Sequence, residues 1–438
     1  MASLNAPAPT AAPRDALSGG RAARVVRRQR TDPTFRPFVV IWEATRACAL
    51  ACVHCRAEAQ PLRHPGELTR AEARWLIGEI RELGSPPPLF VITGGDPFLR
   101  DDLLELVSSA ADAGLPVGVS PSGTPSLTPA ALAALHSAGA TAVSLSIDGS
   151  TAEIHDRFRG VAGTFDQTLR AWDAAREVGL RVQIHTTVGR HNLTDLADVA
   201  HLVARHGAMT WSLFLLVPTG RGRRLAGLDA ATVEDVLNFG YDAGAYVPTR
   251  TTEGHHFRRV VVQRAYLDRL GIEPTAFLGL GPLYRVLRDR LVSVMGAQPR
   301  RIRRPPLDVS AGRGFVFISH LGDVYPSGFL PVSAGNVRSA PLGVMYRDTE
   351  LFRGMRDPAK LHGRCGRCEF AGICGGSRAR AFAVTGDLYA EEPWCAYQPG
   401  SFPFARAAFT HALSAATADA AGYGPGAAQP GPAGRDDA

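Results

Sequence analysis

The stretch Glu43-Ala-Thr-Arg-Ala-Cys-Ala-Leu-Ala-Cys-Val-His-Cys55 decides the fold of this chain, and it directly follows the apolar run Phe38–Trp42. Its three cysteines, Cys48, Cys52 and Cys55, have the spacing CxxxCxxC. Three thiolates on one short loop can bind three irons of a cubane [4Fe–4S] cluster, which leaves the fourth iron without a protein ligand. Three ordinary buried cysteines or part of a zinc site are the alternatives, but structural zinc sites are four-coordinate and usually use CxxC pairs. The spacing predicts an iron–sulfur cluster with one open iron.

Short apolar runs alternate with amphipathic stretches from this loop to about residue 220. Strands are predicted at 38–42, 89–93, 116–120, 142–147, 181–188 and 212–217, and helices at 69–83, 101–113, 128–138, 165–178 and 196–206. Such alternation is typical of a parallel sheet or barrel whose active groups lie at the carboxyl ends of the strands. We therefore expect an α/β fold with a barrel-type core.

The remaining four cysteines, Cys365, Cys368, Cys374 and Cys395, lie together near the C-terminus. With the first three they account for all seven cysteines of the chain. Four thiolates are one complete ligand set, which suits either a zinc ribbon or a second iron–sulfur cluster. An odd number of closely spaced cysteines in a chain with no apolar leader favours metal ligation over disulfides.

A chain of 438 residues is expected to divide into two cored units with some tail. Residues 1–33 are rich in Ala, Pro and Arg and are predicted to be a disordered tail. The barrel core is expected over 34–225, followed by a connector or insertion over 226–310 with helices near 231–246 and 283–295. A strand pair at 315–319 and 322–325 opens a small Cys-rich α+β unit over 311–403, and 404–438 is a helix remnant with a disordered tail.

The net charge of +7 is weak evidence for a polyanionic partner. Residues 1–33 contain six arginines and two aspartates, and 299–306 contains four further arginines, so these two patches more than account for the excess. We expect no nucleic-acid partner. No stretch approaches the roughly 18–20 uncharged apolar residues of a membrane span, so we expect no membrane partner and a cytoplasmic location.

The cysteine loop and the strand–helix alternation resemble the radical S-adenosylmethionine (SAM) superfamily over roughly residues 36–220. The resemblance implies a partial (β/α)6 TIM-type barrel in which the open iron binds SAM. It also implies that an electron, from a donor such as flavodoxin or ferredoxin, cleaves SAM to a 5′-deoxyadenosyl radical, which abstracts a hydrogen from the substrate.

Two loops resemble SAM-contacting motifs of that family. After the second strand, Gly94, Gly95, Asp96 and Pro97 resemble its GGEP motif, whose backbone receives the SAM amino group. Glycines there permit a close approach of the main chain. After the third strand, the family's Thr-Asn-Gly is replaced by Pro-Ser-Gly, which leaves Ser122 as the candidate hydroxyl contact.

The fourth and sixth strands supply the other expected SAM contacts. Ser146 and Asp148 share side-chain parity at the barrel mouth, and Arg159 lies in a stretch that resembles the family's HDxFRG pattern. Arg159 could pair with the SAM carboxylate, although an ordinary salt bridge is the alternative. Leu216 could pack against the adenine ring of SAM, and an ordinary residue of a core strand is the alternative. His54, at a position often aromatic in the family, is expected to contact adenine through its backbone.

The C-terminal segment from Gly363 to Cys395 resembles a SPASM/twitch-type domain. The resemblance implies one auxiliary [4Fe–4S] cluster at Cys365, Cys368, Cys374 and Cys395, with the zinc ribbon as the rival. A full SPASM domain has further cysteines for a second auxiliary cluster, and here Ser327 stands near one of those positions.

The substrate is suggested by resemblance alone. The Cys-Gly-Gly-x-Arg-Ala-Arg-Ala segment that begins at Cys374, together with the stretches 218–222 and 325–337, is most similar to the branch of haem d1 and alternative haem biosynthesis. That branch implies a tetrapyrrole substrate, which the His255-His256 pair and the 299–304 arginines would suit. The alternatives are a maturase of a ribosomal peptide and a non-catalytic Fe–S or zinc-binding regulatory protein. No catalytic residue is predicted.

Overall fold

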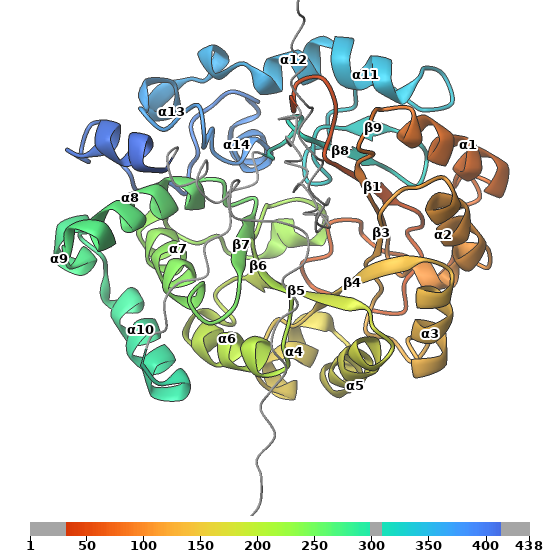
Figure 1. The fold of residues 1–438 in the computed structure, drawn as a ribbon, viewed down its shortest axis with the longest axis horizontal. Helices are drawn as coiled ribbons and strands as arrows, with labels where there is room; N and C mark the ends of the chain where they lie inside the picture. Colours follow the sequence, from red (N-terminus) through yellow and green to blue (C-terminus); the bar gives the residue numbers. More distant parts are fainter. Residues whose placement is uncertain (1–31, 298–308, 413–438) are drawn as a thin grey trace, which may run out of the picture. The chain divides into compact units, whose positions relative to one another are not determined.

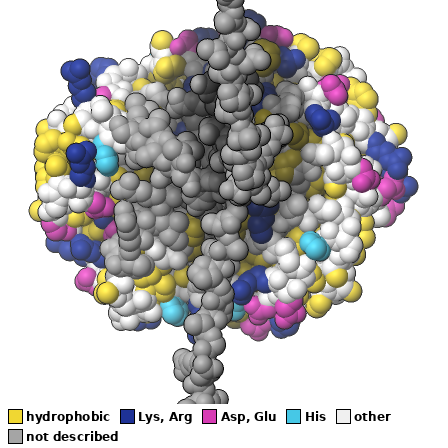
Figure 2. Space-filling model, in the orientation of Figure 1, with side chains coloured by type: hydrophobic (Ala, Val, Ile, Leu, Met, Phe, Trp, Pro, Cys, Tyr) yellow, Lys and Arg dark blue, Asp and Glu magenta, His cyan; other side chains and the backbone are white. Residues whose placement is uncertain are grey.

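A computed structural model describes residues 32–297 and 309–412. Most of both predicted disordered tails, and the arginine patch at 299–304, lie outside these described residues. On the face seen in Figure 2, side chains of both charge signs are interspersed around the visible rim. Among the residues that the structure describes, no helix has the length and apolarity that a bilayer span requires.

A single nine-stranded sheet organises the fold, in the order β7-β6-β5-β4-β3-β2-β1-β8-β9. All neighbouring strands pair in parallel except β8 and β9, which are antiparallel. Figure 1 shows the strands around a centre, with the helices outside them, which confirms the predicted partial barrel. The strands are β1 Val39–Glu43, β2 Leu89–Thr93, β3 Val117–Val119, β4 Ala140–Ser146, β5 Arg181–Val188, β6 Thr210–Leu215, β7 Thr249–Thr252, β8 Phe315–Ile318 and β9 Val324–Tyr325.

The helices pack on the outer face of this sheet through apolar stripes. In α1, for example, Ala73, Leu76, Ile77 and Ile80 recur at helical spacing and are all buried. The helices are α1 Arg70–Arg81, α2 Leu103–Asp112, α3 Pro129–Ser137, α4 Ala152–Arg159, α5 Thr164–Glu177, α6 Leu196–Arg205, α7 Ala230–Ala243, α8 Phe257–Leu270, α9 Pro274–Leu278, α10 Pro282–Met295, α11 Leu342–Asp348, α12 Glu350–Arg356, α13 Gly363–Arg367 and α14 Arg378–Thr385.

Two features of the sheet differ from the six-strand expectation. Strand β7 lies within the predicted connector and pairs in parallel with β6. Strand β8 pairs in parallel with β1, so the strand pair predicted to open the Cys-rich unit extends the barrel sheet. The domain boundaries predicted near residues 225 and 311 therefore lie in segments that join strands of one sheet.

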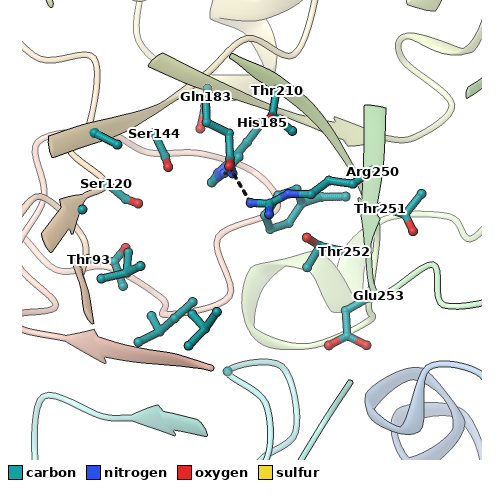
Figure 3. A pocket seen from close by; sticks show the side chains of 18 of the residues that line it. Thr93, Ser120, Ser144, Gln183, His185, Thr210, Arg250, Thr251, Thr252 and Glu253 are labelled. Atoms are coloured by element: carbon teal, nitrogen blue, oxygen red, sulfur yellow. Dashed lines mark hydrogen bonds between the residues drawn. The ribbon is translucent and has the colours of Figure 1, made fainter. Parts of the chain in front are cut away.

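The two faces of the sheet have different surroundings. On β1, Val40 and Trp42 are fully buried in a core shared with the outer helices, whereas Val39 and Ile41 line an internal cavity. This cavity has a volume of about 680 Å³. Closed barrels fill their interior with layers of bulky branched side chains. Here many inward positions are small or polar, among them Gly118 and Ser146. Ser120, Ser144 and Thr210 are further examples (Figure 3).

Candidate active site

The three-cysteine loop follows β1 at the carboxyl end of the sheet. Cys48 and Cys52 are buried, Cys55 is half-buried, and all three are free thiols. The loop's backbone already directs N–H groups at sulfur: Leu50 N lies 3.3 Å from Cys48 Sγ, and Ala59 N lies 3.4 Å from Cys55 Sγ. Such N–H donors favour thiolates, which are the form that binds metal.

Electrostatics around this loop depend on whether a metal is bound. Burial raises the pKa of the Cys48 and Cys52 thiols in the metal-free chain, while Arg159 Nη1, 3.8 Å from Cys52 Sγ, opposes this effect. Among the described residues, no three His, Cys, Asp or Glu side chains converge on one point for a single metal ion. A cubane distributes its thiolates over separate irons, and three free thiols with N–H and guanidinium donors fit such a cluster chemically.

Gly94 and Gly95 allow the loop after β2 to pack directly on the backbone of the cysteine loop. A Cβ added at Gly94 would lie 2.5 Å from the Thr45 carbonyl oxygen, and one at Gly95 would lie 2.3 Å from that of Ala47. Gly95 N donates a 2.8 Å hydrogen bond to Thr45 O. Both glycines line the cavity, and their predicted SAM contact remains a prediction.

Asp96 has a different environment from its glycine neighbours. Its side chain is buried and accepts hydrogen bonds from Thr124 Oγ1 at 2.8 Å and from Phe98 N at 3.2 Å. Neither Asp96 nor Pro97 lines the cavity. Ser122 does line it, donates to Gly95 O at 2.7 Å and lies 3.5 Å from Cys48 Sγ. Asp96 and Ser122 thus connect the β2 and β3 loops, and their predicted SAM contacts remain predictions.

Beyond β4, Arg159 pairs with a partner inside the protein. Its guanidinium forms a 2.5 Å ion pair with Asp148, whose other oxygen accepts from Thr187 N at 2.7 Å. Asp148 is fully buried, and the opposite charge of Arg159 contributes to holding the pKa of its carboxyl at about 2. Arg159 and Ser146 line the cavity, whereas Asp148 does not. Arg159 therefore lies beside the cysteine loop, and the Asp148 carboxylate already neutralises its charge.

His54 and Leu216 pack against their neighbours and do not line the cavity. The His54 ring stacks on Phe158 with centroids 4.2 Å apart, and burial lowers the pKa of the imidazole to about 3. Leu216 is nearly buried, and its carbonyl oxygen accepts from Arg380 Nε at 3.2 Å. The predicted adenine contacts of both residues remain predictions.

The loop after β6 also fixes the cysteine loop, a role that the sequence did not reveal. Gly220 has φ +53°, and a Cβ there would lie 2.5 Å from the Cys55 carbonyl oxygen. Arg221 donates from its backbone N to Cys55 O at 3.0 Å and from Nε to Cys52 O at 2.9 Å. The stretch 218–222 thus holds the carbonyl groups of the cluster-binding loop.

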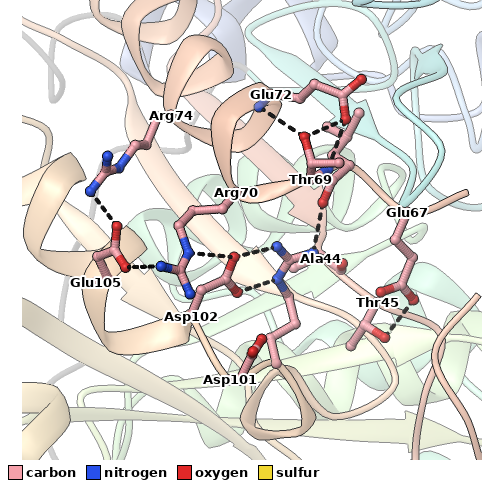
Figure 4. Close-up of polar contacts among 12 residues, drawn as sticks. Ala44, Thr45, Glu67, Thr69, Arg70, Glu72, Arg74, Asp101, Asp102 and Glu105 are labelled. Atoms are coloured by element: carbon pink, nitrogen blue, oxygen red, sulfur yellow. Dashed lines mark hydrogen bonds and ion pairs between the residues drawn. The ribbon is translucent and has the colours of Figure 1, made fainter. Parts of the chain in front are cut away.

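The first residues of the cysteine loop are held by Glu67 (Figure 4). This buried carboxylate accepts a 2.6 Å hydrogen bond from Thr45 Oγ1, and further bonds from Arg46 N and Arg63 Nε. The pKa of Glu67 is lowered by these donors, against the effect of its burial. The loop is therefore preorganised by three separate segments of the chain.

The second group of cysteines lines a separate small cavity of about 30 Å³. Burial raises the pKa of Cys374 to about 12 and that of Cys395 to about 11, and Gly376 N lies 3.4 Å from Cys374 Sγ. His256 lines this cavity and is fully buried, and neither of its ring nitrogens has a hydrogen-bond partner within residues 32–297 and 309–412. Four free thiols with an unpartnered imidazole fit a metal cofactor at this position. Cys365 and Cys368 complete the set.

Glu253, which follows β7, lines the large cavity and contacts Ser377, which lies between Cys374 and Cys395 in the sequence. Glu253 is buried with φ +53°, a conformation that non-glycine residues rarely adopt. Its carboxylate accepts from Ser327 Oγ at 2.7 Å and from Ser377 Oγ, and its carbonyl accepts from Arg380 Nη2 at 2.8 Å. Ser327, near a further-cysteine position of the full SPASM domain, lines the large cavity instead of the four-cysteine one.

Comparison with known proteins identifies the family. The model of the radical SAM superfamily matches residues 42–203. An AdoMet-dependent heme synthase of Oleidesulfovibrio alaskensis is 40% identical over 84% of this chain and 89% of its own length. This chain belongs to the radical SAM superfamily. The corresponding protein of Methanosarcina barkeri is 37% identical over 84% of this chain and 98% of its own length.

A maturase and a solved structure are also similar to this chain, at lower sequence identity. The mycofactocin maturase MftC of Mycobacterium tuberculosis is 30% identical over 82% of this chain and 83% of its own length. The crystal structure of Streptococcus suis SuiB bound to S-adenosylmethionine aligns with a TM-score of 0.58 at 14% identity, covering 83% of this chain and 78% of that one. The latter likeness supports the fold alone.

As a radical SAM enzyme, the chain uses a [4Fe–4S] cluster and SAM, which together supply a 5′-deoxyadenosyl radical that abstracts hydrogen from a substrate. Cys48, Cys52 and Cys55 would hold this cluster. The chain's own residues fix that loop, and a cavity lined by several arginines lies beside it.

Proposed function

We propose that this radical SAM enzyme forms haem from a tetrapyrrole that carries propionate side chains. The main support comes from two relatives named AdoMet-dependent heme synthase, from Oleidesulfovibrio alaskensis and Methanosarcina barkeri. Each matches 84% of this chain, at 40% and 37% identity respectively. A match over nearly the whole of those proteins includes the cavity as well as the cluster loop.

The charge and size of the large cavity support this substrate class. Ligand cavities for molecules of drug size or larger commonly measure about 300–1,000 Å³, and this one measures about 680 Å³. Among the described residues that line it, five are arginines and one, Glu253, is acidic. Guanidinium groups bind carboxylates well. The five arginines are Arg56, Arg159, Arg181, Arg250 and Arg258.

The four C-terminal cysteines would hold one auxiliary [4Fe–4S] cluster, with His256 beside it. His255 lines the substrate cavity, and its neighbour in the sequence, His256, lines the four-cysteine cavity. This cluster would therefore lie near the substrate and serve to exchange an electron with it. A small electron-transfer protein such as flavodoxin or ferredoxin would reduce the enzyme.

The test is an anaerobic reaction of the reconstituted enzyme with SAM, dithionite and iron coproporphyrin III. We expect 5′-deoxyadenosine and haem to form together, as measured by liquid chromatography and mass spectrometry. 5′-Deoxyadenosine without any change in the porphyrin would contradict the substrate proposal and leave the radical SAM activity intact.

A peptide maturase is the second candidate, favoured by the 30% identity to MftC. If the chain is a peptide maturase, the porphyrin should stay unchanged under the same conditions. A small precursor peptide should instead lose mass or gain a crosslink. The two candidates therefore give opposite results in one assay.

A further inference from the structure

Three polar side chains on β5 and β7 form a connected group inside the large cavity (Figure 3). Arg250 Nη2 donates a 2.5 Å hydrogen bond to Gln183 Oε1, and Gln183 Nε2 is hydrogen-bonded to His185 Nε2. All three line the cavity. Gln183 is buried, whereas Arg250 is exposed to the cavity interior although it belongs to the barrel sheet.

The direction of these bonds fixes the protonation of His185. A guanidinium can only donate, so the Gln183 oxygen must face Arg250 and its NH2 group must face His185. His185 Nε2 must then accept, which places the proton of the neutral imidazole on Nδ1. Burial together with the positive charge of Arg250 lowers the pKa of His185 to about 3, so the ring is neutral near pH 7.

The group therefore presents donors to the cavity. His185 Nδ1 has no hydrogen-bond partner among the residues that the structure describes. The imidazole ring packs against the Phe214 ring, and the two ring centroids lie 4.5 Å apart. The Arg250 guanidinium adds a positive charge and several N–H groups. An N–H donor beside a guanidinium is complementary to a carboxylate.

The strand register places these donors near the reacting end of the cavity. Ser146 on β4 pairs with His185 on β5, His185 pairs with Ser212 on β6, and Ser212 pairs with Arg250 on β7. Ser146, a predicted SAM contact, thus lies in the same row across the sheet as both donors. A group bound here would lie at the level where the substrate meets SAM.

We propose that Arg250 and His185 form a subsite that binds one carboxylate of the substrate, and that Gln183 is a positioning residue that orients both. This inference rests on the proposed function, because it assigns a place in the cavity to one propionate of the tetrapyrrole. The subsite does not include Arg159, which forms an ion pair with Asp148.

The test measures binding of zinc coproporphyrin III, a fluorescent and redox-inactive probe, to the reconstituted enzyme by fluorescence titration. Its tetramethyl ester, which has the same ring and no carboxylate, is titrated in parallel. The variants are Arg250→Ala, His185→Leu, His185→Asn and Gln183→Leu. Arg353→Ala, which removes an exposed arginine from α12, is the matched charge control. Iron content and the thermal unfolding midpoint check the fold of each variant.

We expect Arg250→Ala, His185→Leu and Gln183→Leu to bind the free acid at least about tenfold more weakly, because each loses or misdirects a charge-assisted hydrogen bond. Binding of the ester should not change. His185→Asn should recover most of the affinity, because its amide places an N–H donor near the position of Nδ1. Arg353→Ala should bind like the unmodified chain.

Equal weakening for acid and ester, or no weakening at all, would overturn the subsite while leaving the proposed function standing. If the unmodified chain binds neither porphyrin, the proposed substrate is wrong and the subsite falls with it. The two failures are therefore distinguishable in one set of titrations.

Discussion

At the residue scale, the site depends on a few positions where backbone approaches backbone. Gly95 belongs to a motif that the sequence predicted as a SAM contact, and the structure adds that it packs on Ala47 beside Cys48. Any side chain there collides with a carbonyl group and not with a flexible side chain. The position therefore controls the cluster loop as well as the cofactor surface.

Gly95→Ala should displace the cysteine loop, because the new Cβ would lie 2.3 Å from the Ala47 oxygen. We expect fewer irons per chain after reconstitution and SAM affinity reduced at least about tenfold, measured by iron analysis and equilibrium dialysis. Gly78→Ala is the matched control, because a Cβ at this position in α1 meets nothing within 4 Å. This control should keep full iron content and become more stable by about 0.5–1 kcal/mol. Equal behaviour of the two variants would refute the close-packing argument.

The sequence predicted the cysteines and glycines of the site because their spacing is local. It did not predict the Arg250–Gln183–His185 group, because the hydrogen-bonded residues Arg250 and Gln183 lie 67 positions apart in the sequence. A hint was present in β5, where the polar residues Arg181, Gln183 and His185 alternate with the apolar residues Val182 and Ile184. In a strand covered on both faces, such alternation indicates a polar interior.

At the element scale, α1 begins with a capping box between Thr69 and Glu72 (Figure 4). Glu72 also contacts the C-terminal part of the chain. Glu72 accepts from Arg338 Nε at 2.5 Å, and this bond, with those from Thr69, holds the pKa of Glu72 at about 2. The helix start therefore carries a pH-dependent contact.

Glu72→Gln should lower the free energy of unfolding at pH 7 by less than about 1 kcal/mol, because the pair is about one-third exposed. Since the pKa of Glu72 is lowered on folding from 4.5, its stabilisation is full above about pH 4.5 and is lost as the pH falls to about 2. The difference in unfolding midpoint between the two proteins should shrink over that range. Glu153→Gln, in the first turn of α4 with only the exposed Arg157 as partner, is the control and should change less. A difference that grows on acidification would contradict the assignment.

Eight of the nine strands were predicted within about two residues: the six of the core, each an apolar run buried on at least one face, and the pair β8 and β9. Strand β7 was not predicted, because its four residues, Thr249–Thr252, include no aliphatic side chain. It forms because β6 offers an unpaired edge and α7 precedes it closely. Tertiary pairing, not local pattern, decides such a strand.

At the scale of the whole molecule, the barrel and the four-cysteine segment are joined by buried polar contacts. Arg380 on α14 is fully buried, forms a 3.0 Å ion pair with Glu392 and donates to the carbonyl groups of Leu215 and Glu253. The two cavities share this wall, since His255 lines one and His256 the other. An auxiliary cluster there would be rigidly placed relative to the substrate.

Metal analysis tests that arrangement. One cluster per cysteine group predicts about eight irons and no zinc per chain. Replacing Cys365, Cys368, Cys374 and Cys395 by alanine should leave about four irons and retain SAM cleavage without haem formation. About four irons and one zinc in the unmodified chain would instead show that the second site is a zinc ribbon.

The most direct test of the account follows one hydrogen atom from the substrate to SAM. Iron coproporphyrin III deuterated in its propionate side chains is incubated anaerobically with the reconstituted enzyme, SAM and dithionite, and 5′-deoxyadenosine is analysed by mass spectrometry. We predict 5′-deoxyadenosine enriched in one deuterium with the unmodified chain, and none with Cys48, Cys52 and Cys55 replaced by alanine. Unlabelled 5′-deoxyadenosine from the unmodified chain, formed while the porphyrin keeps all its deuterium, would contradict the claim that this cavity presents a propionate to the radical.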